Sequence, residues 1–281
     1  MTQTLTPLPE SSLSGKTALV TGSSRGIGAD TARYLAQAGA NVVINYRNKA
    51  PRAEKLAAEL RDLGVQVLVV GADLTDAASV QAMFDEVART FGTLDILVLN
   101  ASGGMESGMA EDYALKLNRD AQLNVLETAL PLLAEGSRVV FVTSHQAHFI
   151  RTTPTMPEYE PVALSKRAGE DALRERIPAL TERGVEFVVV SGDMIEGTIT
   201  ATLLERANPG AIAARREDAK TANEPSAAIS GRPTETRVSM SCARIDHSAP
   251  NDVTSPTRRV LSAGTGSRAA RATSAANSET L

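Results

Sequence analysis

A glycine-rich octapeptide, TGSSRGIG, occupies residues 21–28, between a short apolar segment and a helical pattern that ends near residue 38. A strand that turns through glycines into a helix points several backbone N–H groups, and the positive end of the helix dipole, at one place. Such a place suits a phosphate group. The spacing G-x-x-x-G-x-G differs from the commoner G-x-G-x-x-G, so a glycine-rich turn without a ligand is the alternative.

Each glycine of the octapeptide has its own expected role. Gly22 permits a tight turn, and Gly26 lets the backbone approach a pyrophosphate with no Cβ in the way. Gly28 lets the helix pack closely on the strand. The octapeptide therefore predicts a phosphate-binding corner between the first strand and the first helix.

Short apolar strands alternate with helices along the chain. Strands are predicted at 17–20, 42–44, 65–70, 96–99, 138–142 and 187–190, and helices at 26–37, 51–63, 76–91, 113–134, 161–183 and 199–206. Pro131 is expected to shorten or kink the helix at 113–134, and Pro178 to bend the helix at 161–183. Apolar runs such as Val42-Val43-Ile44 suit strands that are covered on both faces. We therefore expect an α/β fold with a doubly wound, Rossmann-like parallel sheet, and chemistry at the carboxyl ends of its strands.

Composition excludes several classes of protein. The chain of 281 residues has a net charge of −4, which leaves no basic footprint for nucleic acid. Its single cysteine, Cys242, cannot form an internal disulfide, so a cytoplasmic protein is expected. Residues 1–14, expected to be flexible, lack the pattern of a secretory signal, and no apolar run approaches the ~20 residues of a membrane span.

The ends of the second, third and fourth strands bear on the cofactor. An acid after the second strand would favour NAD, but residues 45–48 contain none. They contain Arg47, which can pair with a 2′-phosphate with help from Arg25, so NADP is favoured; a solvated surface position is the alternative for Arg47. Asp73 is expected near an adenine or as a helix cap, although Asp76 is the better cap candidate. Residues 100–104 form a flexible segment beside the cofactor cleft.

Jointly and in this order, these motifs resemble the short-chain dehydrogenase/reductase family over residues 16–206. The matching residues are the octapeptide, Asp73-Leu74, Asn100-Ala101-Ser102-Gly103, Asn118 followed by Ala129-Leu130-Pro131, Ser144, and Ser165-Lys166. The resemblance implies an NAD(P) cofactor and hydride transfer between a nicotinamide and a small-molecule carbonyl or alcohol. No metal site is expected. The cofactor contacts that it implies are Gly22, Ser24, Arg25, Gly26, Ile27, Gly28, Arg47, Asp73, Leu74, Asn100, Ala101, Ser102, Lys166 and Thr198.

The resemblance also implies four catalytic groups, of which three match directly. Ser144 would hold the substrate oxygen, Lys166 would bind the nicotinamide ribose, and Asn118 would hold a water for proton relay. The fourth group is a tyrosine four residues before the lysine, and Val162 stands there. The nearest tyrosine is Tyr159, which a long proline- and threonine-rich loop could reposition as the proton donor.

Alternatives remain open around this site. Tyr159 could only pack against the surface, and His145 and His148, beside Ser144, are other acid/base candidates or solvated loop residues. After the sixth strand, Ser191-Gly192 stands where the family has Pro-Gly. The next threonine, Thr198, either contacts the cofactor or caps the helix that follows.

The tail, residues 214–281, differs from the preceding domain at 15–213. Small and polar residues dominate it, no aromatic residue occurs after Phe187, and no apolar periodicity survives. We expect disorder, without the last strand that the family normally has. A reading-frame shift and a genuine disordered tail are both hypotheses for it, and the missing strand puts a homo-oligomer in doubt.

Two functions follow from the sequence. The first is an NADP-dependent reductase or dehydrogenase with Tyr159 as its acid. The second is a catalytically impaired NADP(H)-binding protein that acts as a sensor or through a partner. Asn118, Ser144 and Lys166 favour the enzyme, whereas Val162 and the missing last strand favour the sensor.

Overall fold

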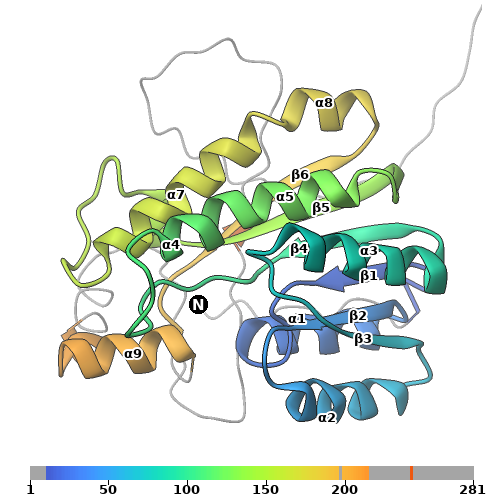
Figure 1. Cartoon of the computed structure of the whole chain (residues 1–281), viewed down its shortest axis with the longest axis horizontal. Coiled ribbons are helices and arrows are strands. Elements are labelled where there is room, and N and C mark those ends of the chain that lie inside the picture. The colour runs from blue at the N-terminus through green and yellow to red at the C-terminus, as the bar shows by residue number, and fades with distance from the viewer. Residues whose placement is uncertain (1–10, 196–197, 215–240, 243–281) are drawn as a thin grey trace, which may run out of the picture. The chain divides into compact units, whose positions relative to one another are not determined.

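The computed structural model describes residues 11–195, 198–214 and 241–242 (Figure 1). Within them, strands form one sheet in the order β3-β2-β1-β4-β5-β6-β7. The strands are β1 (Thr17–Val20), β2 (Asn41–Tyr46), β3 (Val67–Gly71), β4 (Leu94–Leu99), β5 (Leu133–Ser144), β6 (Glu186–Gly192) and β7 (Ser241–Cys242). The first six strands are parallel, and only β7 is antiparallel to its neighbour. The expected doubly wound parallel sheet is confirmed.

The order of the strands reverses at β1, which lies between β2 and β4. The chain builds the sheet outward from β1 to β3, then returns to β1 and builds outward again through β4, β5 and β6. In such sheets, a crevice opens at the carboxyl ends of the strands beside the point of reversal. The glycine-rich octapeptide follows β1 directly, so the fold places it at this crevice.

Helices cover both faces of the sheet (Figure 1). Helices α1 (Gly26–Gln37) and α2 (Ala50–Arg61) pack on one face through a core that includes Val42 and Ile44 of β2. Helices α3 (Ala77–Phe91), α5 (Ala121–Ala129) and α7 (Glu160–Arg174) contribute to the core of the other face, which includes Val43. Neighbouring residues of β2 are thus buried on opposite faces, which explains the unbroken apolar run.

Several predicted elements coincide with the structure. β1 and α1 have the predicted bounds. Helix α3 is capped by Asp76, whose carboxylate accepts a hydrogen bond of 3.1 Å from the N–H of Ala78, and it ends at Gly92. Helix α9 (Ile199–Ala207) is one residue longer than predicted. Local signals, such as caps and glycines, fixed these ends.

Two predicted helices are shorter in the structure than their predicted ranges, and both change at the prolines expected to shorten or bend them. The helix expected at 113–134 consists of α4 (Tyr113–Leu115), a π-helical turn η1 (Lys116–Asp120) and α5, and it ends at Ala129. Pro131 follows, and β5 has already begun at Leu133, before the predicted start of that strand. The helix expected at 161–183 is divided into α7 and α8 (Ile177–Glu182), because Pro178 is accommodated in the first turn of a new helix.

The two termini test the sequence analysis only in part. Of the N-terminal segment 1–14, the structure describes residues from Ser11, and the Leu13 N–H donates a 2.8 Å hydrogen bond to the Ala38 carbonyl. No last strand was expected in the tail, and the described residues there add the two-residue strand β7 beside β6. The predictions of disorder and of a reading-frame shift concern residues 215–240 and 243–281, outside the described part of the chain. The domain limits 15–213 stay a prediction.

Candidate functional site

A cleft of about 540 Å³ lies at the carboxyl ends of β1, β2, β3 and β4. Of the predicted cofactor contacts, those that line it are Gly22, Ser24, Arg25, Gly26, Ile27, Gly28, Arg47, Asp73, Leu74, Asn100, Ala101, Ser102 and Thr198. The structure therefore brings thirteen predicted residues from five segments of the chain to one hollow. Lys166, also predicted to contact the cofactor, is not among the lining residues.

The three glycines have the backbone geometry that their expected roles require. Gly22 has φ +63° and Gly26 has φ +57°, in the region that favours glycine. A Cβ on Gly26 would meet no atom within 4 Å, so the backbone there faces open space. A Cβ on Gly28 would lie 2.6 Å from Asn100 Nδ2 and 2.8 Å from the Gly22 carbonyl oxygen. Close packing of the helix on the loop thus requires glycine at position 28.

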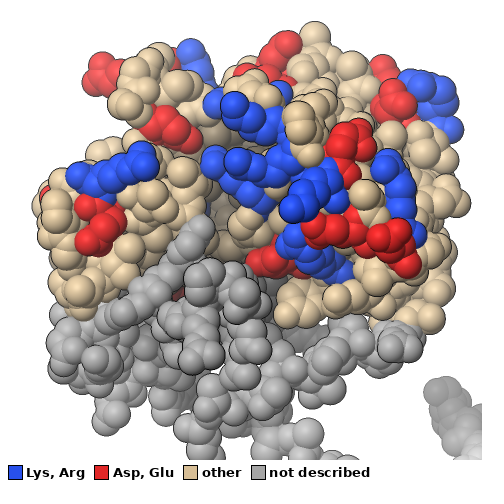
Figure 2. Space-filling view, turned by 90° about the horizontal axis from the view of Figure 1, so that it is seen from below, with Lys and Arg blue, Asp and Glu red and all other residues tan. Residues whose placement is uncertain are grey.

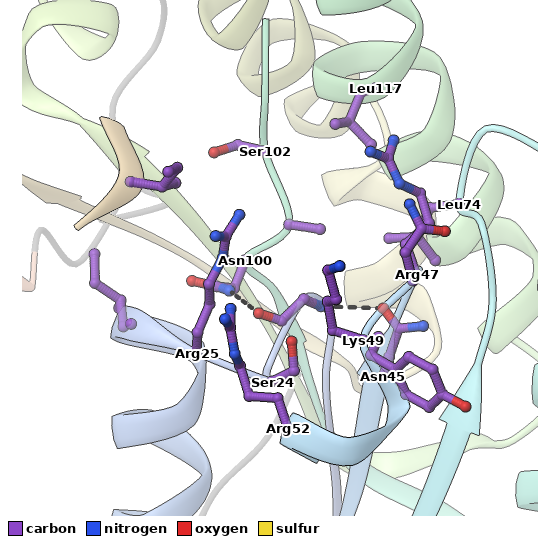
Figure 3. Close-up of a pocket in the computed structure, with 18 of the residues that line it drawn as sticks. Ser24, Arg25, Asn45, Arg47, Lys49, Arg52, Leu74, Asn100, Ser102 and Leu117 are labelled. Atoms are coloured by element: carbon purple, nitrogen blue, oxygen red, sulfur yellow. Dashed lines mark hydrogen bonds between the residues drawn. The ribbon is translucent and has the colours of Figure 1, made fainter. Parts of the chain in front are cut away.

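Two asparagines fix the shape of the glycine loop (Figure 3). Asn45 Oδ1 accepts a 3.0 Å hydrogen bond from the Gly22 N–H, and Asn45 Nδ2 donates to the Ala72 carbonyl at 3.3 Å. Asn100 Nδ2 donates to the Thr21 carbonyl at 2.8 Å. The sequence analysis did not include Asn45 among the site residues. A polar residue at the end of an apolar strand was the signal that could have revealed it.

Four cations line the cleft: Arg25, Arg47, Lys49 and Arg52. Figure 2 shows Lys and Arg side chains gathered on the lower face of the molecule. In Figure 3, the nitrogen atoms of Arg25, Lys49 and Arg52 point into the same part of the cleft, whereas Arg47 extends toward Leu74 and Leu117. Lys49 and Arg52 were missed, because they precede and begin α2 and reach the cleft only through the turn after β2.

Arg47 has a partner within the protein. Its Nη1 donates a 2.6 Å hydrogen bond to the Tyr113 hydroxyl, and its guanidinium carbon lies 5.8 Å from the Tyr113 ring centroid. Arg47 is exposed, but it lines the cleft and is bonded to a buried tyrosine, so it is both a surface residue and a wall of the cleft, and its pairing with a phosphate stays a prediction.

Asp73 and Thr198, for which capping was the alternative role, both make local hydrogen bonds. Asp73 Oδ1 accepts from the Thr75 N–H at 3.0 Å and from the Thr75 hydroxyl at 2.7 Å, so Asp73 closes the turn before α3 while Asp76 caps the helix. Thr198 caps α9, since its hydroxyl accepts from the Ala201 N–H at 3.3 Å. Both residues also line the cleft, so capping does not remove them from it.

The geometry of the cleft fits a dinucleotide that carries an additional phosphate. Its floor is a glycine turn at the N-terminus of α1, where backbone N–H groups and the helix dipole favour an anion. The space that a side chain on Gly26 would occupy is open in the structure. Arg25, which directly precedes α1, and Lys49 and Arg52, which follow β2, supply positive charge to the cleft.

The hydroxyls of Ser144 and Tyr159 form a pair. Ser144 Oγ and Tyr159 Oη are 3.1 Å apart, although fifteen residues separate them in the sequence. Ser144 ends β5 and caps the short helix α6 (His145–His148), while Tyr159 directly precedes α7. Tyr159 is 3% exposed and packs within an apolar cluster that includes Val162 and Met194, so it does not lie on the surface.

The other two predicted catalytic residues lie in α7 and η1. Lys166 is partly exposed on α7, seven positions after Tyr159, which corresponds to two helical turns or roughly 10 Å of rise. Asn118 is buried in η1, and its Nδ2 donates to the Gly103 carbonyl at 2.8 Å and to Ser165 Oγ at 2.9 Å. Both amide hydrogens of Asn118 are thus used by the protein, and its role in holding a water stays a prediction. None of Asn118, Ser144, Tyr159 and Lys166 lines the cleft described above.

Gly169 is a residue that the sequence analysis missed. A Cβ at this position of α7 would collide with the carbonyl oxygen of Asn118. The backbones of α7 and η1 are therefore in direct contact at Gly169. This contact fixes the position of the helix that carries Lys166. A glycine within a helical pattern was the available signal.

A family model described as short chain dehydrogenase matches residues 16–208. The chain belongs to this family. The match covers more than half of the chain, so the predicted family membership is confirmed.

Among short-chain dehydrogenase relatives, the hydroxynaphthalene reductase arp2 of Aspergillus fumigatus is 39% identical over 150 residues, which are 51% of this chain and 54% of that protein. The short chain dehydrogenase/reductase nsrJ of Aspergillus novofumigatus is 34% identical over 201 residues, 69% of this chain and 73% of the relative. The match spans only about half the length of several relatives, 54% for GME11373 of Pestalotiopsis microspora.

Solved structures of other proteins show the same fold. A short chain dehydrogenase from Burkholderia cenocepacia J2315 in complex with NADP has a TM-score of 0.56 and 36% identity, over 62% of this chain and 71% of that one. The NADH-dependent reductase A1-R′ has a TM-score of 0.60 and 27% identity, over 68% of this chain and 82% of that one. Within the residues that the structure describes, no helix combines the length and hydrophobicity needed to cross a bilayer.

Proposed function

We propose that this short-chain dehydrogenase is an NADP-dependent reductase or dehydrogenase whose reacting pair is Ser144 and Tyr159. The distance of 3.1 Å between their hydroxyl oxygens carries the proposal. A carbonyl oxygen placed against this pair would receive one hydrogen bond from each hydroxyl. Because Tyr159 is buried, the proton transfer would take place away from bulk water, where such hydrogen bonds are strong.

Each residue has a distinct part in the proposed reaction. A bound nicotinamide supplies or accepts a hydride on its ring. Tyr159 donates the proton to the substrate oxygen in reduction and takes it back in oxidation, and Ser144 orients that oxygen. Lys166, two turns further along α7, binds the nicotinamide ribose. Asn118 holds the loop after β4 in place, because it accepts a hydrogen bond from the Gly103 N–H and donates one to the Gly103 carbonyl.

The preference for NADP rests on the charges of the cleft. Arg25, Lys49 and Arg52 point into one part of it, and no Asp or Glu follows β2 at residues 45–48 to bind a ribose hydroxyl. One relative was solved with NADP and another is NADH-dependent, so the family alone does not decide the cofactor. Guanidinium groups match phosphate geometry with two parallel hydrogen bonds, which supports NADP over NAD.

The second candidate is a catalytically impaired NADP(H)-binding protein that acts as a sensor or through a partner. The observation that favours it is Val162, which stands four residues before Lys166, is buried, and packs against Gly104. A valine there can neither donate nor accept a proton. The cleft would then bind NADP(H) without catalysing a reaction.

The setting of the reaction is part of the proposal. We expect a small carbonyl or alcohol substrate, action in the cytoplasm, and no nucleic-acid, membrane or metal partner. The name of the relative arp2, a hydroxynaphthalene reductase, supports a small-molecule substrate. A homo-oligomer stays an open prediction.

Oxidation of NADPH in the presence of a panel of small ketones tests the two candidates. Tyr159→Phe removes the hydroxyl of the pair, and Tyr34→Phe is the matched control, because Tyr34 is 53% exposed on α1. Loss of turnover in Tyr159→Phe alone, with NADPH binding intact, is the expected result. Turnover that survives Tyr159→Phe would exclude this tyrosine as the proton donor. Tight NADPH binding without turnover of any ketone would favour the sensor.

A further inference from the structure

A cluster of charged side chains outside the cleft joins α6 to α7. The Glu170 carboxylate is completely buried at its centre. Its Oε2 lies 2.9 Å from Nδ1 of His148, the last residue of α6. Its Oε1 accepts hydrogen bonds from Arg174 at 2.8 Å (Nε) and 2.7 Å (Nη2). The proposed reaction uses none of these groups.

The contacts of Glu170 define the direction of the hydrogen bond from His148. Burial raises the pKa of the Glu170 carboxyl, but the hydrogen bonds and charges of His148 and Arg174 outweigh burial and lower it below its ordinary value. An ionised carboxylate can only accept hydrogen bonds, so Nδ1 of His148 carries the proton and donates. A buried ion pair seldom stabilises a fold more than apolar side chains of similar volume. The effect of this buried ion pair is instead to hold α6 in a fixed position.

Arg167 provides a second tie between the two helices. Its Nη1 donates a 2.9 Å hydrogen bond to the His148 carbonyl, and its Nη2 pairs with Asp171 at 2.7 Å. Helix α6 has only four residues, too few to be stable without tertiary contacts. Besides α7, the side chain of Asp193 after β6 holds it, through a 2.9 Å hydrogen bond from Gln146. The orientation of α6 therefore depends on these partners.

The two helices that these contacts join, α6 and α7, each begin directly after one member of the reacting pair. Ser144 precedes α6 and caps it, since its hydroxyl accepts a 3.3 Å hydrogen bond from the Ala147 N–H. Tyr159 precedes α7. Each hydroxyl of the pair thus stands at the start of one of the two clamped helices. A shift of α6 along α7 changes the distance between the two hydroxyls.

We propose that His148, Arg167 and Glu170 are positioning residues, which clamp α6 onto α7 and thereby set the distance between the Ser144 and Tyr159 hydroxyls. The effect of the clamp on the reaction rate rests on the proposed function. Its effect on α6 does not, because the order of a helix can be measured without turnover.

Substitutions of His148 test the clamp, because Glu170 keeps its pairing with Arg174 when His148 is replaced. His148→Leu removes the donor. His148→Asn returns an N–H near the position of Nδ1, but it cannot exchange protons as an imidazole does. Glu127→Gln is the control, since it breaks an exposed ion pair of 2.9 Å between Glu127 and Arg176, beyond the other end of α7. Turnover of a ketone, the dissociation constant for NADPH, and hydrogen exchange of the amides of α6 are measured in each full-length variant.

In His148→Leu, kcat is expected to fall by about tenfold to a hundredfold, the usual cost of displacing a reacting group by about 1 Å. Hydrogen exchange of the α6 amides should become faster. The KM for NADPH and the dissociation constant for NADPH should stay at the parent values, because the cleft is built from other elements. His148→Asn should restore both the rate and the slow exchange, and Glu127→Gln should behave as the parent.

Parent-like turnover and exchange in His148→Leu would overturn the clamp. A loss of rate that His148→Asn does not restore would also overturn it, because that result assigns proton transfer to the imidazole itself. If the parent turns over no ketone, the proposed function fails, and faster exchange in His148→Leu with recovery in His148→Asn still supports the clamp, while unchanged exchange overturns it. Arg167→Met provides the same comparison through the second tie if His148→Leu does not fold.

Discussion

The guanidinium of Arg47 and the hydroxyl of Tyr113 are joined by a 2.6 Å hydrogen bond, which connects the end of β2 to the first residue of α4. Burial raises the pKa of Tyr113, and the charge of Arg47 opposes that increase. The tyrosine therefore stays a neutral partner at physiological pH, and it does not neutralise the arginine. Arg47 is held at the wall of the cleft with its charge intact.

Arg47→Asp is expected to weaken the binding of NADPH far more than that of NADH. The substitution removes a cation and places a carboxylate near the expected 2′-phosphate. Hydrogen bonds to charged groups contribute roughly 1.5–3 kcal/mol, which corresponds to at least tenfold in the dissociation constant for NADPH. Fluorescence titration with each reduced dinucleotide measures the effect. Arg89→Asp, at an exposed position of α3, controls for the change in net charge. Equal weakening for both dinucleotides would exclude Arg47 as a partner of the 2′-phosphate and leave only Arg25, Lys49 and Arg52 in that role.

Gly28→Ala is expected to destabilise the protein and to impair binding of NADPH. The new methyl group would lie 2.6 Å from Asn100 Nδ2 and 2.8 Å from the Gly22 carbonyl, so the glycine loop must move. Overpacking of this kind costs about 1–3 kcal/mol in the free energy of unfolding. Urea denaturation measures it. Gly192→Ala is the control, because a Cβ there meets no atom within 4 Å and the backbone is not in the left-handed region. Parent-like stability of Gly28→Ala would contradict the tight packing.

Gly169→Ala is expected to separate α7 from η1. Its methyl group would collide with the carbonyl oxygen of Asn118, a backbone atom that cannot rotate away. We expect a loss of about 1–3 kcal/mol in the free energy of unfolding. Because α7 carries Lys166, ketone turnover should fall as well. Denaturation curves and kcat, compared with those of Gly192→Ala, test both effects, and a variant as stable and active as the parent would refute the contact.

The fold was readable from the sequence because its determinants are local. Glycines with positive φ, such as Gly22 and Gly92, stand where the chain must turn, and Asp76 caps the helix that it precedes. The errors have equally specific causes. The π-helical turn η1 depends on packing against α7, and Gly169 takes part in that contact although it lies about fifty positions away in the sequence. No propensity at residues 116–120 reports such a partner.

The site was less readable, because its contacts are distant in sequence. Thirteen of the predicted cofactor residues line one cleft because their segments follow strands, and parallel strands end at one edge of the sheet; Lys166, on α7, is the exception. Lys49 and Arg52 reach the cleft through the turn after β2, whose direction the sequence does not reveal. The Ser144–Tyr159 distance depends on how α6 packs on α7, which no single motif specifies.

The stability of the protein should fall at acidic pH in a way that depends on Glu170. Its pKa is lower in the folded protein than the ordinary value of 4.5, because His148 and Arg174 favour the charged form by more than burial opposes it. A carboxyl with a depressed folded pKa adds stability that is fully present above the unfolded pKa and is lost as the pH falls through the folded pKa. Between these two values, the unfolded chain binds more protons than the folded one. The free energy of unfolding should therefore decrease as the pH drops below about 4.5.

Glu170→Gln isolates this contribution, because a glutamine of nearly the same size carries no titrating group. Its free energy of unfolding should be lower than that of the parent at neutral pH, since the charges of Arg174 and Arg167 lose their buried partner. The difference between the two proteins should shrink as the pH falls from about 4.5 through the lower pKa of Glu170 in the folded protein, where the parent also loses the ionised carboxylate. Urea denaturation across the acidic range measures both curves, with Glu127→Gln as an exposed control. A difference that stays constant down to the acid limit would show that Glu170 is not ionised in the folded protein, and the hydrogen-bond direction assigned to His148 would fall with it.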